Sequence, residues 1–326
     1  MAAGEVRLTT KGKAQVGPGA GIFVAWRGGS GVPASRGSAR RNIVRRLPVS
    51  SPRMGAGGRI AWSAASAAAA GIAWGHFEAG WLRERTLPCP LPGLPAELEG
   101  VRIAHLSDFH LGIPSRGARA VERAVEWVEE RRPDLVCISG DLLSRPAGEA
   151  RLRALVARLP AATYAVLGNH DYAATRDPFS RPAAVADLAP ATLLADEAAT
   201  LELYRRRVQI VGVDPRTYWF RRARPERLAD PAADLRILLC HYPGVIDKLE
   251  PGAFHLVLAG HLHSGQICVP YGFGKLRLAH LRPRYYEGLF RRPAGMLHVS
   301  PGLGTTFVPF RIAARPEVTE LVLESV

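Results

Sequence analysis

Cysteine is scarce in this chain of 326 residues, which contains four cysteines and no CxxC pair. A chain of this length with so few cysteines is not expected to depend on a disulfide framework. Cys137 and Cys240 lie inside apolar runs, which is typical of inert core residues. The sequence has no internal repeat, and its length suits one large domain or two small ones.

The chain also lacks a long, strongly apolar run. Residues 60–75 carry no charge, but their apolar character comes mostly from alanine. A membrane-spanning helix needs about 20 strongly apolar residues, and extending the run to residue 82 adds His76 and Glu78. We therefore predict a signal peptide or an N-terminal membrane anchor at residues 60–82, with a soluble alanine-rich helix as the alternative. By the positive-inside rule, residues 1–59 would then stay in the cytoplasm, and the rest of the chain would cross to the cell envelope.

Acidic residues are nearly absent from the first 58 positions, which hold ten Lys or Arg and a single acid, Glu5. This segment supplies nine of the 14 net positive charges, so the rest of the chain is only mildly basic. We interpret residues 1–59 as a disordered basic leader or a mis-annotated start, with Met54 as another initiator. No series of Tyr or Phe alternates with these arginines, so nucleic acid is not expected as a partner.

The composition is that of a globular protein, with 47% hydrophobic and 22% charged residues. Residues 83–100 are rich in proline and are predicted to be a linker. Beyond them, short runs rich in Val, Ile and Leu are typical of buried strands; they are residues 101–106, 135–139, 163–167, 208–213, 235–240 and 255–259. Helices are expected at 116–132 and 149–159, and short strands follow residue 263. The pattern predicts one layered α/β domain over residues 101–326.

Polar side chains that suit metal ions follow directly after several predicted strands. Ligands collect at the carboxyl ends of strands in open α/β sheets, so this placement by itself indicates a site. Asp108 and His110 come after the first strand and would share one side of an extended chain. An oxygen–nitrogen pair of this kind suits Mn, Fe or Zn. Alone, an Asp-x-His is more often a surface turn than a site.

Two further strand ends supply a carboxylate and an amide. Gly140 lets the backbone approach a ligand closely, and the carboxylate of Asp141 could bridge two cations. Asn169 offers a neutral oxygen, and His170 beside it could stabilise a transferring phosphoryl group or protonate the leaving oxygen. Asp171 is predicted to hold the His170 ring in orientation.

Histidines follow the last two of these strands. His241 comes directly after residues 235–240, where a lone histidine would more often be a satisfied core residue. His261 and His263 follow a glycine and are two residues apart, so both imidazoles could face adjacent ions. Each motif is modest by itself, but their ordered recurrence at five strand ends is not expected by chance.

The ordered set Asp-x-His, Gly-Asp, Gly-Asn-His-Asp, His and Gly-His-x-His resembles the motifs of the calcineurin-like metallophosphoesterase superfamily, with no ligand replaced. The resemblance implies a four-layer α/β/β/α sandwich with a dimetal site at the carboxyl ends of the strands. It also implies two divalent ions, Mn, Zn or Fe. One ion would take Asp108, His110, Asp141 and His263, and the other would take Asp141, Asn169, His241 and His261.

The C-terminal region is similar to one bacterial branch, the exported or membrane-associated YkuE/YaeI-type phosphodiesterases, and to the chlamydial-type UDP-2,3-diacylglucosamine pyrophosphatase. Pro301 departs from that branch, where a basic residue is expected. The resemblance implies hydrolysis of phosphodiester or pyrophosphate bonds by metal-activated hydroxide, on a substrate such as a cell-envelope lipid or a nucleotide-sugar. A phosphomonoesterase, including a protein phosphatase, and a non-catalytic interaction scaffold on the same fold are the alternatives.

One further segment, residues 217–224, combines three aromatic residues with three arginines. Tyr218, Trp219 and Phe220 could hold a lipid-bearing anionic substrate or contact a membrane surface. The alternative is a surface helix whose aromatic side chains pack on the core.

Overall fold

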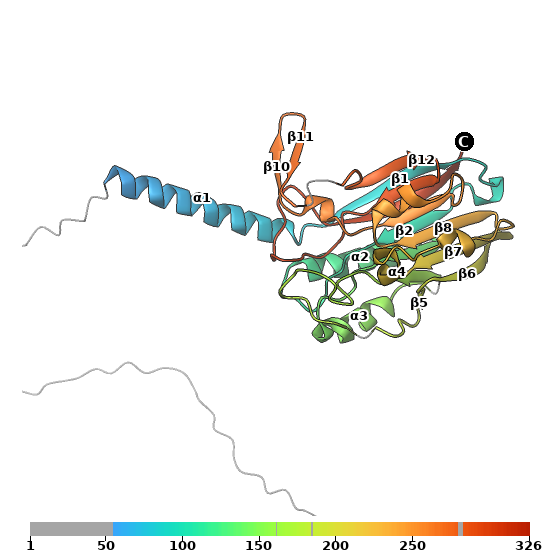
Figure 1. The fold of residues 1–326 in the computed structure, drawn as a ribbon. Helices are drawn as coiled ribbons and strands as arrows, with labels where there is room; N and C mark the ends of the chain where they lie inside the picture. Colours follow the sequence, from blue (N-terminus) through green and yellow to red (C-terminus); the bar gives the residue numbers. More distant parts are fainter. Residues whose placement is uncertain (1–54, 161, 184, 280–282) are drawn as a thin grey trace, which may run out of the picture. The chain divides into compact units, whose positions relative to one another are not determined.

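The computed structural model describes residues 55–160, 162–183, 185–279 and 283–326. These residues belong to one compact unit, residues 54–326. Of the predicted leader, residues 1–59, positions 1–54 lie outside the described residues. Its last residues are already helical, since α1 (Ala56–Glu78) begins four residues before the predicted apolar segment (Figure 1).

Two six-stranded sheets form the body of this unit. The first has the order β1-β14-β2-β3-β4-β5 and consists of β1 (Arg83–Leu91), β14 (Glu317–Ser325), β2 (Arg102–Leu106), β3 (Leu135–Ser139), β4 (Thr163–Val166) and β5 (Thr192–Leu193). The second has the order β12-β13-β9-β8-β7-β6 and consists of β12 (Gly288–Arg292), β13 (Gly295–Val299), β9 (Leu256–Ala259), β8 (Leu235–Cys240), β7 (Arg206–Val213) and β6 (Glu197–Leu203). A separate hairpin is formed by β10 (Cys268–Tyr271) and β11 (Gly274–Arg277).

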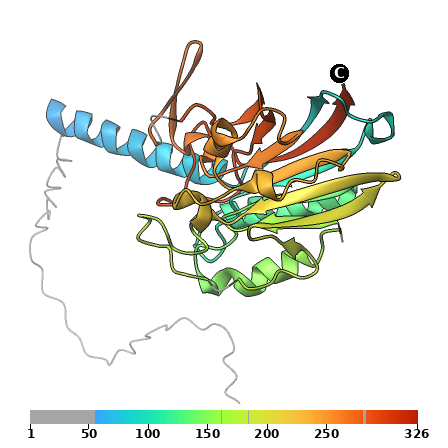
Figure 2. The ribbon, with the colours of Figure 1, turned by 45° about the vertical axis from the view of Figure 1, so that its right-hand side comes forward.

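The sheets pack face to face because alternate residues of their strands are apolar on each side. In β8, Ile237 and Leu239 face a core shared with the first sheet, whereas Leu238 and Cys240 face the opposite side. Helices α2 (Gly117–Arg131) and α3 (Glu149–Val156) cover the outer face of the first sheet (Figure 2). Short helical segments, α4 (Pro215–Trp219) and η4 (Pro243–Lys248), cover the second. The predicted α/β/β/α sandwich is confirmed, with one thin helical layer.

Residues 83–100 begin with a strand, and the prediction of a linker was wrong for that part. β1 runs parallel to β14 along an edge of the first sheet. Pro88 and Pro90 are two residues apart, so their nitrogens, which lack hydrogen, point to the same side of the strand. An edge strand tolerates this because one of its sides has no ladder to complete. Cys89 and Leu91 are fully buried, so β1 belongs to the domain.

The C-terminal end of α1 is fixed to the domain, while most of its earlier residues are exposed. The buried carboxylate of Glu78 accepts hydrogen bonds from the backbone N–H groups of Ala313 (3.1 Å) and Ala314 (2.7 Å). The Gly75 carbonyl accepts a further one from the Arg311 N–H. In the described part of the chain, no helix has both the length and the apolar character that crossing a bilayer requires. A signal peptide or anchor at residues 60–82 stays a prediction.

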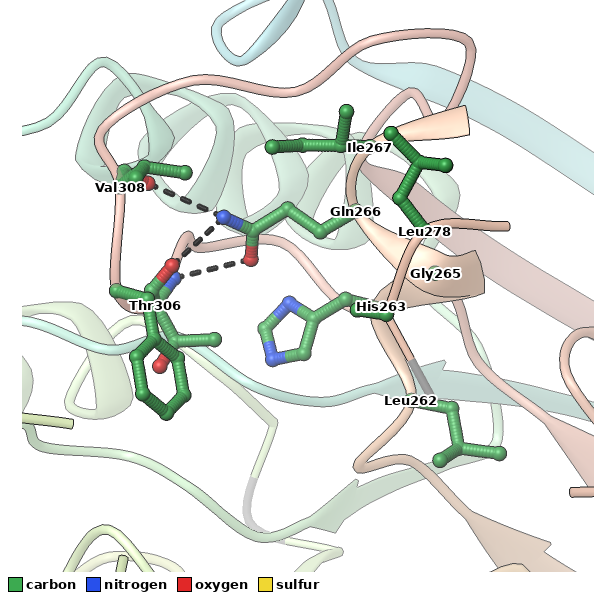
Figure 3. Close-up of a pocket in the computed structure, with 10 residues that line it drawn as sticks. Leu262, His263, Gly265, Gln266, Ile267, Leu278, Thr306 and Val308 are labelled. Atoms are coloured by element: carbon green, nitrogen blue, oxygen red, sulfur yellow. Dashed lines mark hydrogen bonds between the residues drawn. The ribbon is translucent and has the colours of Figure 1, made fainter. Parts of the chain in front are cut away.

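The loop between β13 and β14, residues 300–316, lies beside the carboxyl ends of the strands, and Gln266 holds it there. The Gln266 Nε2 donates to the carbonyls of Thr306 (2.7 Å) and Val308 (3.1 Å), and its Oε1 accepts from the Thr306 N–H (3.1 Å) (Figure 3). The same view shows the His263 ring next to this loop. The loop therefore forms one wall of the region where the sequence predicts a site.

Replacing Glu78 tests how α1 is fixed. Glu78→Ala is expected to lower the free energy of unfolding by about 2 kcal/mol, because two backbone N–H groups lose their acceptor. Urea unfolding followed by circular dichroism measures the change. Glu84→Ala, at an exposed position of β1, is the control and should change stability by less than about 0.5 kcal/mol. Equal stability of the two variants would contradict the assignment.

Candidate metal centre

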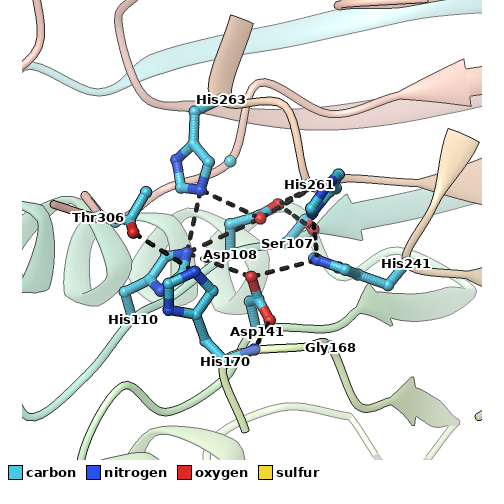
Figure 4. A network of polar contacts seen from close by, with 12 residues as sticks. Ser107, Asp108, His110, Asp141, Gly168, His170, His241, His261, His263 and Thr306 are labelled. Atoms are coloured by element: carbon cyan, nitrogen blue, oxygen red, sulfur yellow. Dashed lines mark hydrogen bonds and ion pairs between the residues drawn. The ribbon is translucent and has the colours of Figure 1, made fainter. Parts of the chain in front are cut away.

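Five strand ends meet at one place in the structure. β2, β3 and β4 are parallel neighbours in the first sheet, and β8 and β9 are parallel neighbours in the second. Their carboxyl ends therefore lie at one edge of the sandwich, where side chains from all five ends converge (Figure 4). Potential ligand atoms form three groups, each within 4.8 Å: Asp108, His110 and His263; His110, Asp141 and His170; and Asp141, His241 and His261.

The first group is almost completely buried. The Nε2 atoms of His110 and His263 lie 3.0 Å apart, and the His263 Nε2 lies 3.3 Å from the Asp108 Oδ1. No more than 3% of each of these residues is exposed. Two imidazole lone pairs that face each other so closely repel unless a proton or a cation lies between them. The group therefore fits a cation.

The second and third groups share the carboxylate of Asp141. Its Oδ2 lies 3.2 Å from the His241 Nε2 and 3.6 Å from the His110 Nε2. The His241 Nδ1 lies 2.8 Å from the Ser139 carbonyl, which can only accept, so Nδ1 carries the hydrogen. With its hydrogen held on Nδ1, His241 directs Nε2 at the group, and a metal ion there would take the place of a second proton. The His261 Nδ1 lies 3.2 Å from the same Nε2.

Asn169 is the seventh predicted ligand. Its Oδ1 is buried and has no hydrogen-bond partner within the described part of the chain. A buried amide oxygen in that state costs free energy unless some other group satisfies it. Carboxylate, imidazole and amide donors suit Mn, Fe or Zn. The residues present therefore fit divalent metal ions.

The backbone at the site adopts an uncommon conformation. Five of the seven predicted ligands have positive φ angles, in degrees: Asp108 (55), His110 (48), Asp141 (54), His261 (77) and His263 (47). Such angles are uncommon outside glycine, and they cluster at functional sites where the surrounding structure supports them. The sequence argument assumed an extended chain at Asp108–His110 and His261–His263. The chain instead turns at each strand end, and both members of each pair still reach the cluster.

Glycines leave the carboxylates room to enter the cluster. A Cβ on Gly168 would collide with the carboxylate of Asp141, and a Cβ on Gly260 would collide with that of Asp108. Both glycines follow a strand directly or closely, and the sequence shows them as part of the Gly-Asn-His-Asp and Gly-His-x-His motifs. These positions therefore require glycine for space rather than for turn geometry.

Asp171 does not take the position that the sequence predicted. Its carboxylate accepts hydrogen bonds from the backbone N–H groups of Gly168 (2.8 Å) and Leu143 (2.7 Å), and so ties the loops after β3 and β4 together. Burial raises the pKa of Asp171 to about 7. The carboxyl group supports the loop that carries His170, and none of the described contacts joins it to the His170 ring.

A different carboxylate, Asp177, lies beside that ring. The Asp177 Oδ2 is 3.9 Å from the His170 Nδ1 and accepts a hydrogen bond from the Thr306 Oγ1 (2.9 Å). The Thr306 hydroxyl is in turn 3.4 Å from the His170 Nε2. Sequence reasoning missed both residues, because Asp177 follows no strand and Thr306 is 129 residues away along the chain.

Arg311 is a third residue that sequence reasoning missed. Its fully buried guanidinium donates to the carbonyls of Gly304 and Pro301, each at 2.9 Å, and one terminal nitrogen is 3.0 Å from the His263 Nδ1. Burial lowers the pKa of Arg311 to about 10, so it remains charged at neutral pH. A cation therefore lies next to Pro301, although residue 301 is not basic.

The charges of the cluster support one another. Burial by itself lowers the pKa of His241, but the carboxylates of Asp141 and Asp108 outweigh burial and raise it to about 9. Burial raises the pKa of Asp141, yet His241 and His170 bring it well below the usual value. Both carboxylates thus stay ionised in a buried place, which requires compensating positive charge.

Two cavities adjoin the cluster on different sides. One of about 230 Å³ has His263 in its wall, together with the apolar side chains of Leu262, Ile267, Leu278, Phe307 and Val308 (Figure 3). The other, of about 100 Å³, contains Asn169 and is lined by Tyr172, Trp219, Phe220 and Tyr242 among others.

The aromatic segment predicted at residues 217–224 lies at the second cavity. Trp219 and Phe220 are 59% and 67% exposed. Tyr218 instead stacks on Tyr242, with ring centroids 4.7 Å apart. The alternative prediction, that the aromatic side chains pack on the core, is therefore correct for Tyr218 but not for Trp219 and Phe220.

Comparisons with known proteins agree with this site. A family model described as calcineurin-like phosphoesterase matches residues 101–265. The metallophosphoesterase YkoQ of Bacillus subtilis is 30% identical, over 70% of this chain and 84% of its own. Phosphodiesterase YaeI of Escherichia coli is 26% identical, over 81% and 96%. UDP-2,3-diacylglucosamine pyrophosphatase LpxG of Chlamydia trachomatis is 27% identical, over 74% and 89%.

This chain belongs to the calcineurin-like phosphoesterase family. The family is one of hydrolytic phosphoesterases that use divalent metal ions. The resemblance that the sequence motifs indicated, including the YaeI-type branch and the chlamydial pyrophosphatase, is confirmed.

Adding a methyl group at Gly168 tests the geometry of the cluster. Gly168→Ala is expected to reduce metal affinity about tenfold or more, because the methyl group displaces Asp141. Metal content after reconstitution with Mn is measured by mass spectrometry. Gly272→Ala is the matched control, since a Cβ there meets nothing within 4 Å. Wild-type metal content in a folded Gly168→Ala variant would contradict the proposed position of Asp141.

Proposed function

We propose that this protein is a dinuclear metal-dependent phosphoesterase that hydrolyses phosphodiester or pyrophosphate bonds. The observation that carries the proposal is the position of the Asp141 carboxylate between two groups of imidazoles. Its Oδ2 lies 3.2 Å from the His241 Nε2 on one side and 3.6 Å from the His110 Nε2 on the other. A carboxylate shared by two ligand groups suits two adjacent divalent ions.

The seven predicted ligands would divide between the two ions around Asp141. Asp108, His110 and His263 would complete the first site, and Asn169, His241 and His261 would complete the second. The first site then has two carboxylates, whereas the second has one carboxylate and a neutral amide. When bound, such ions lower the pKa of a water molecule and neutralise charge on phosphoryl oxygens. Mn, Zn and Fe all suit these donors.

His170 is the proposed catalytic side chain. Its ring lies against that of His110, with centroids 4.6 Å apart, and only 4% of the residue is exposed. The carboxylate of Asp177 lies 3.9 Å from its Nδ1 and would orient the ring. The Nε2 could then donate to a phosphoryl oxygen or to the leaving oxygen. Asp171 would act through the loop, by holding its backbone.

The substrate is proposed to be a phosphoester or pyrophosphate of the cell envelope with an apolar part, such as a lipid or a lipid-bearing nucleotide-sugar. The apolar cavity with His263 in its wall supports this, because it could take an apolar group next to the reacting phosphate. The names of YaeI, a phosphodiesterase, and LpxG, a pyrophosphatase of a diacylated sugar nucleotide, support the same bond types. An envelope location, with residues 60–82 as anchor, belongs to this proposal.

Removing the shared carboxylate tests the dinuclear site. Asp141→Ala is expected to abolish binding of both ions and to lower turnover of an aryl phosphodiester and a pyrophosphate by about 10³-fold or more. His241→Ala should lose one ion and keep the other, because its imidazole belongs to one group only. Metal content and turnover are measured on the same samples.

His76→Ala is the control for these variants, since His76 lies on α1 and outside the cluster. It should keep wild-type metal content and turnover. Unchanged turnover of the aryl phosphodiester in Asp141→Ala would remove the basis of the proposal. A wild-type protein that hydrolysed only monoesters would favour the phosphomonoesterase alternative, and one with no hydrolytic activity would favour the scaffold.

Changing His170 separates chemistry from metal binding. His170→Gln is expected to retain two ions and to lose about 10²–10⁴-fold in turnover, because general acid catalysis is removed. Asp177→Asn should retain both ions and lose less, since it only weakens the orientation of the His170 ring. If His170→Gln lost an ion, His170 would be a metal ligand rather than an acid. Its position within 4.8 Å of His110 and Asp141 would then be explained by that role.

A further inference from the structure

The β10–β11 hairpin has an apolar face that no part of the described structure covers. Val269 and Leu276 are directly paired across the strands, and Tyr271 and Leu278 continue the same face two residues away. These four side chains are between 50% and 64% exposed, and Phe273 in the turn is completely exposed. A hairpin in water normally directs its apolar face inward, so this arrangement is reversed.

The opposite face of the hairpin is polar and holds the hairpin to the domain. The Lys275 Nζ donates to the Ser264 Oγ (2.6 Å) and the Ala313 carbonyl (3.3 Å), and it pairs with Glu287 (2.7 Å). The Arg277 guanidinium lies 4.0 Å from the centre of the Tyr286 ring. Because these contacts fix the orientation of the hairpin, its apolar face is presented outward by the fold itself.

The C-terminal end of α1 lies beside the hairpin in both views of the fold (Figures 1 and 2). A groove of about 390 Å³ between them is lined by Trp74, Trp81, Arg83, Pro270, Lys275 and Arg315 among others. Trp74, Phe77 and Trp81 form an exposed aromatic cluster, with ring centroids 5.6–6.3 Å apart. Tryptophans next to Lys and Arg are typical of the water–lipid interface.

We propose that the apolar face of the β10–β11 hairpin docks into the surface of an anionic lipid bilayer, with the groove beside α1 at the level of the headgroups. An anionic surface complements the net charge of +14, nine of which the basic leader supplies. In the groove, Arg83 pairs with Glu317 and Lys275 with Glu287, which leaves Arg315 as the groove cation with no carboxylate ion pair among the described residues. A second copy of the chain would instead bring the same positive charges together. The apolar face and the aromatic end of α1 together provide what an interfacial protein buries below the headgroups.

Docking here would bring the bilayer close to the candidate metal centre. Ile267 and Leu278, which flank the hairpin strands, line the cavity that contains His263. A phosphoester in the bilayer surface would therefore reach the centre along the base of the hairpin. This surface differs from the Tyr218–Phe220 segment, which lies at the cavity beside Asn169. The proposal concerns the membrane contact and holds whether or not the centre is catalytic.

A fluorescent label reports insertion directly. All four native cysteines are buried, so Phe273→Cys can be labelled selectively with a polarity-sensitive dye in the full-length chain. Vesicles containing phosphatidylglycerol are expected to increase its emission severalfold with a blue shift. Tyr204→Cys is the matched control, since Tyr204 is 58% exposed in the turn between β6 and β7. The proposal is overturned if vesicles leave the emission of the label at position 273 unchanged, or if the label at position 204 shows the same increase and blue shift.

Charge placed on the apolar face should release the protein. Val269→Asp/Leu276→Asp is expected to lower the vesicle-bound fraction about tenfold in flotation, with unchanged thermal unfolding and unchanged turnover of a soluble aryl phosphodiester. The flotation is repeated at about 1 M NaCl, where the Debye length falls to about 3 Å. At this salt concentration the electrostatic attraction of the basic leader to the vesicles is suppressed. Equal binding of wild type and variant at both salt concentrations overturns the proposal. So does a variant that loses self-association in light scattering but still binds vesicles.

Discussion

The Asp141 carboxylate is the group on which the rest of the site depends. It is 1% exposed and lies where the carboxyl ends of two separate sheets meet. One oxygen faces the imidazoles of His110 and His241, and the other accepts a hydrogen bond from the backbone N–H of His170 at 2.8 Å. Burial alone would favour its neutral form, so the charge is held only because positive groups surround it. Any change in how the sheets pack would separate those groups.

This constraint explains the local backbone. Left-handed residues cost about 1–3 kcal/mol each, and five of them carry ligand side chains. Gly168 and Gly260 leave the space that the carboxylates need. Contacts beside the cluster offset part of the strain. Asp171 joins two strand-end loops, and buried Arg311 holds the 300–316 loop through its carbonyls. The backbone at the strand ends is thus less stable than an unstrained one, and this conformation brings the ligand side chains together.

The sequence predicted more of the centre than of its surroundings. The ligand motifs were visible because they follow apolar runs with the pattern of buried strands, and those runs are β2, β3, β4, β8 and β9. Residues 83–91 were not predicted as a strand, because prolines argue against a strand except at the edge of a sheet, and the sequence does not show which strands are edges. Asp177 and Arg311 were missed because neither follows a strand. Asp171 was given the place of Asp177, since adjacency in sequence was taken for adjacency in space.

The sequence by itself determined the fold class and a set of metal-binding side chains, because strand periodicity and strand-end motifs are local properties. Only the tertiary structure decided which carboxylate faces His170, which cation lies beside Pro301, and which way the β10–β11 hairpin turns its apolar face. Asp177 is placed through its contact with Thr306, 129 residues away, and the Arg311 and hairpin contacts depend on the packing of loops over a sheet edge. Such contacts are set by the closed packing of the sandwich, and no local pattern of residues contains them.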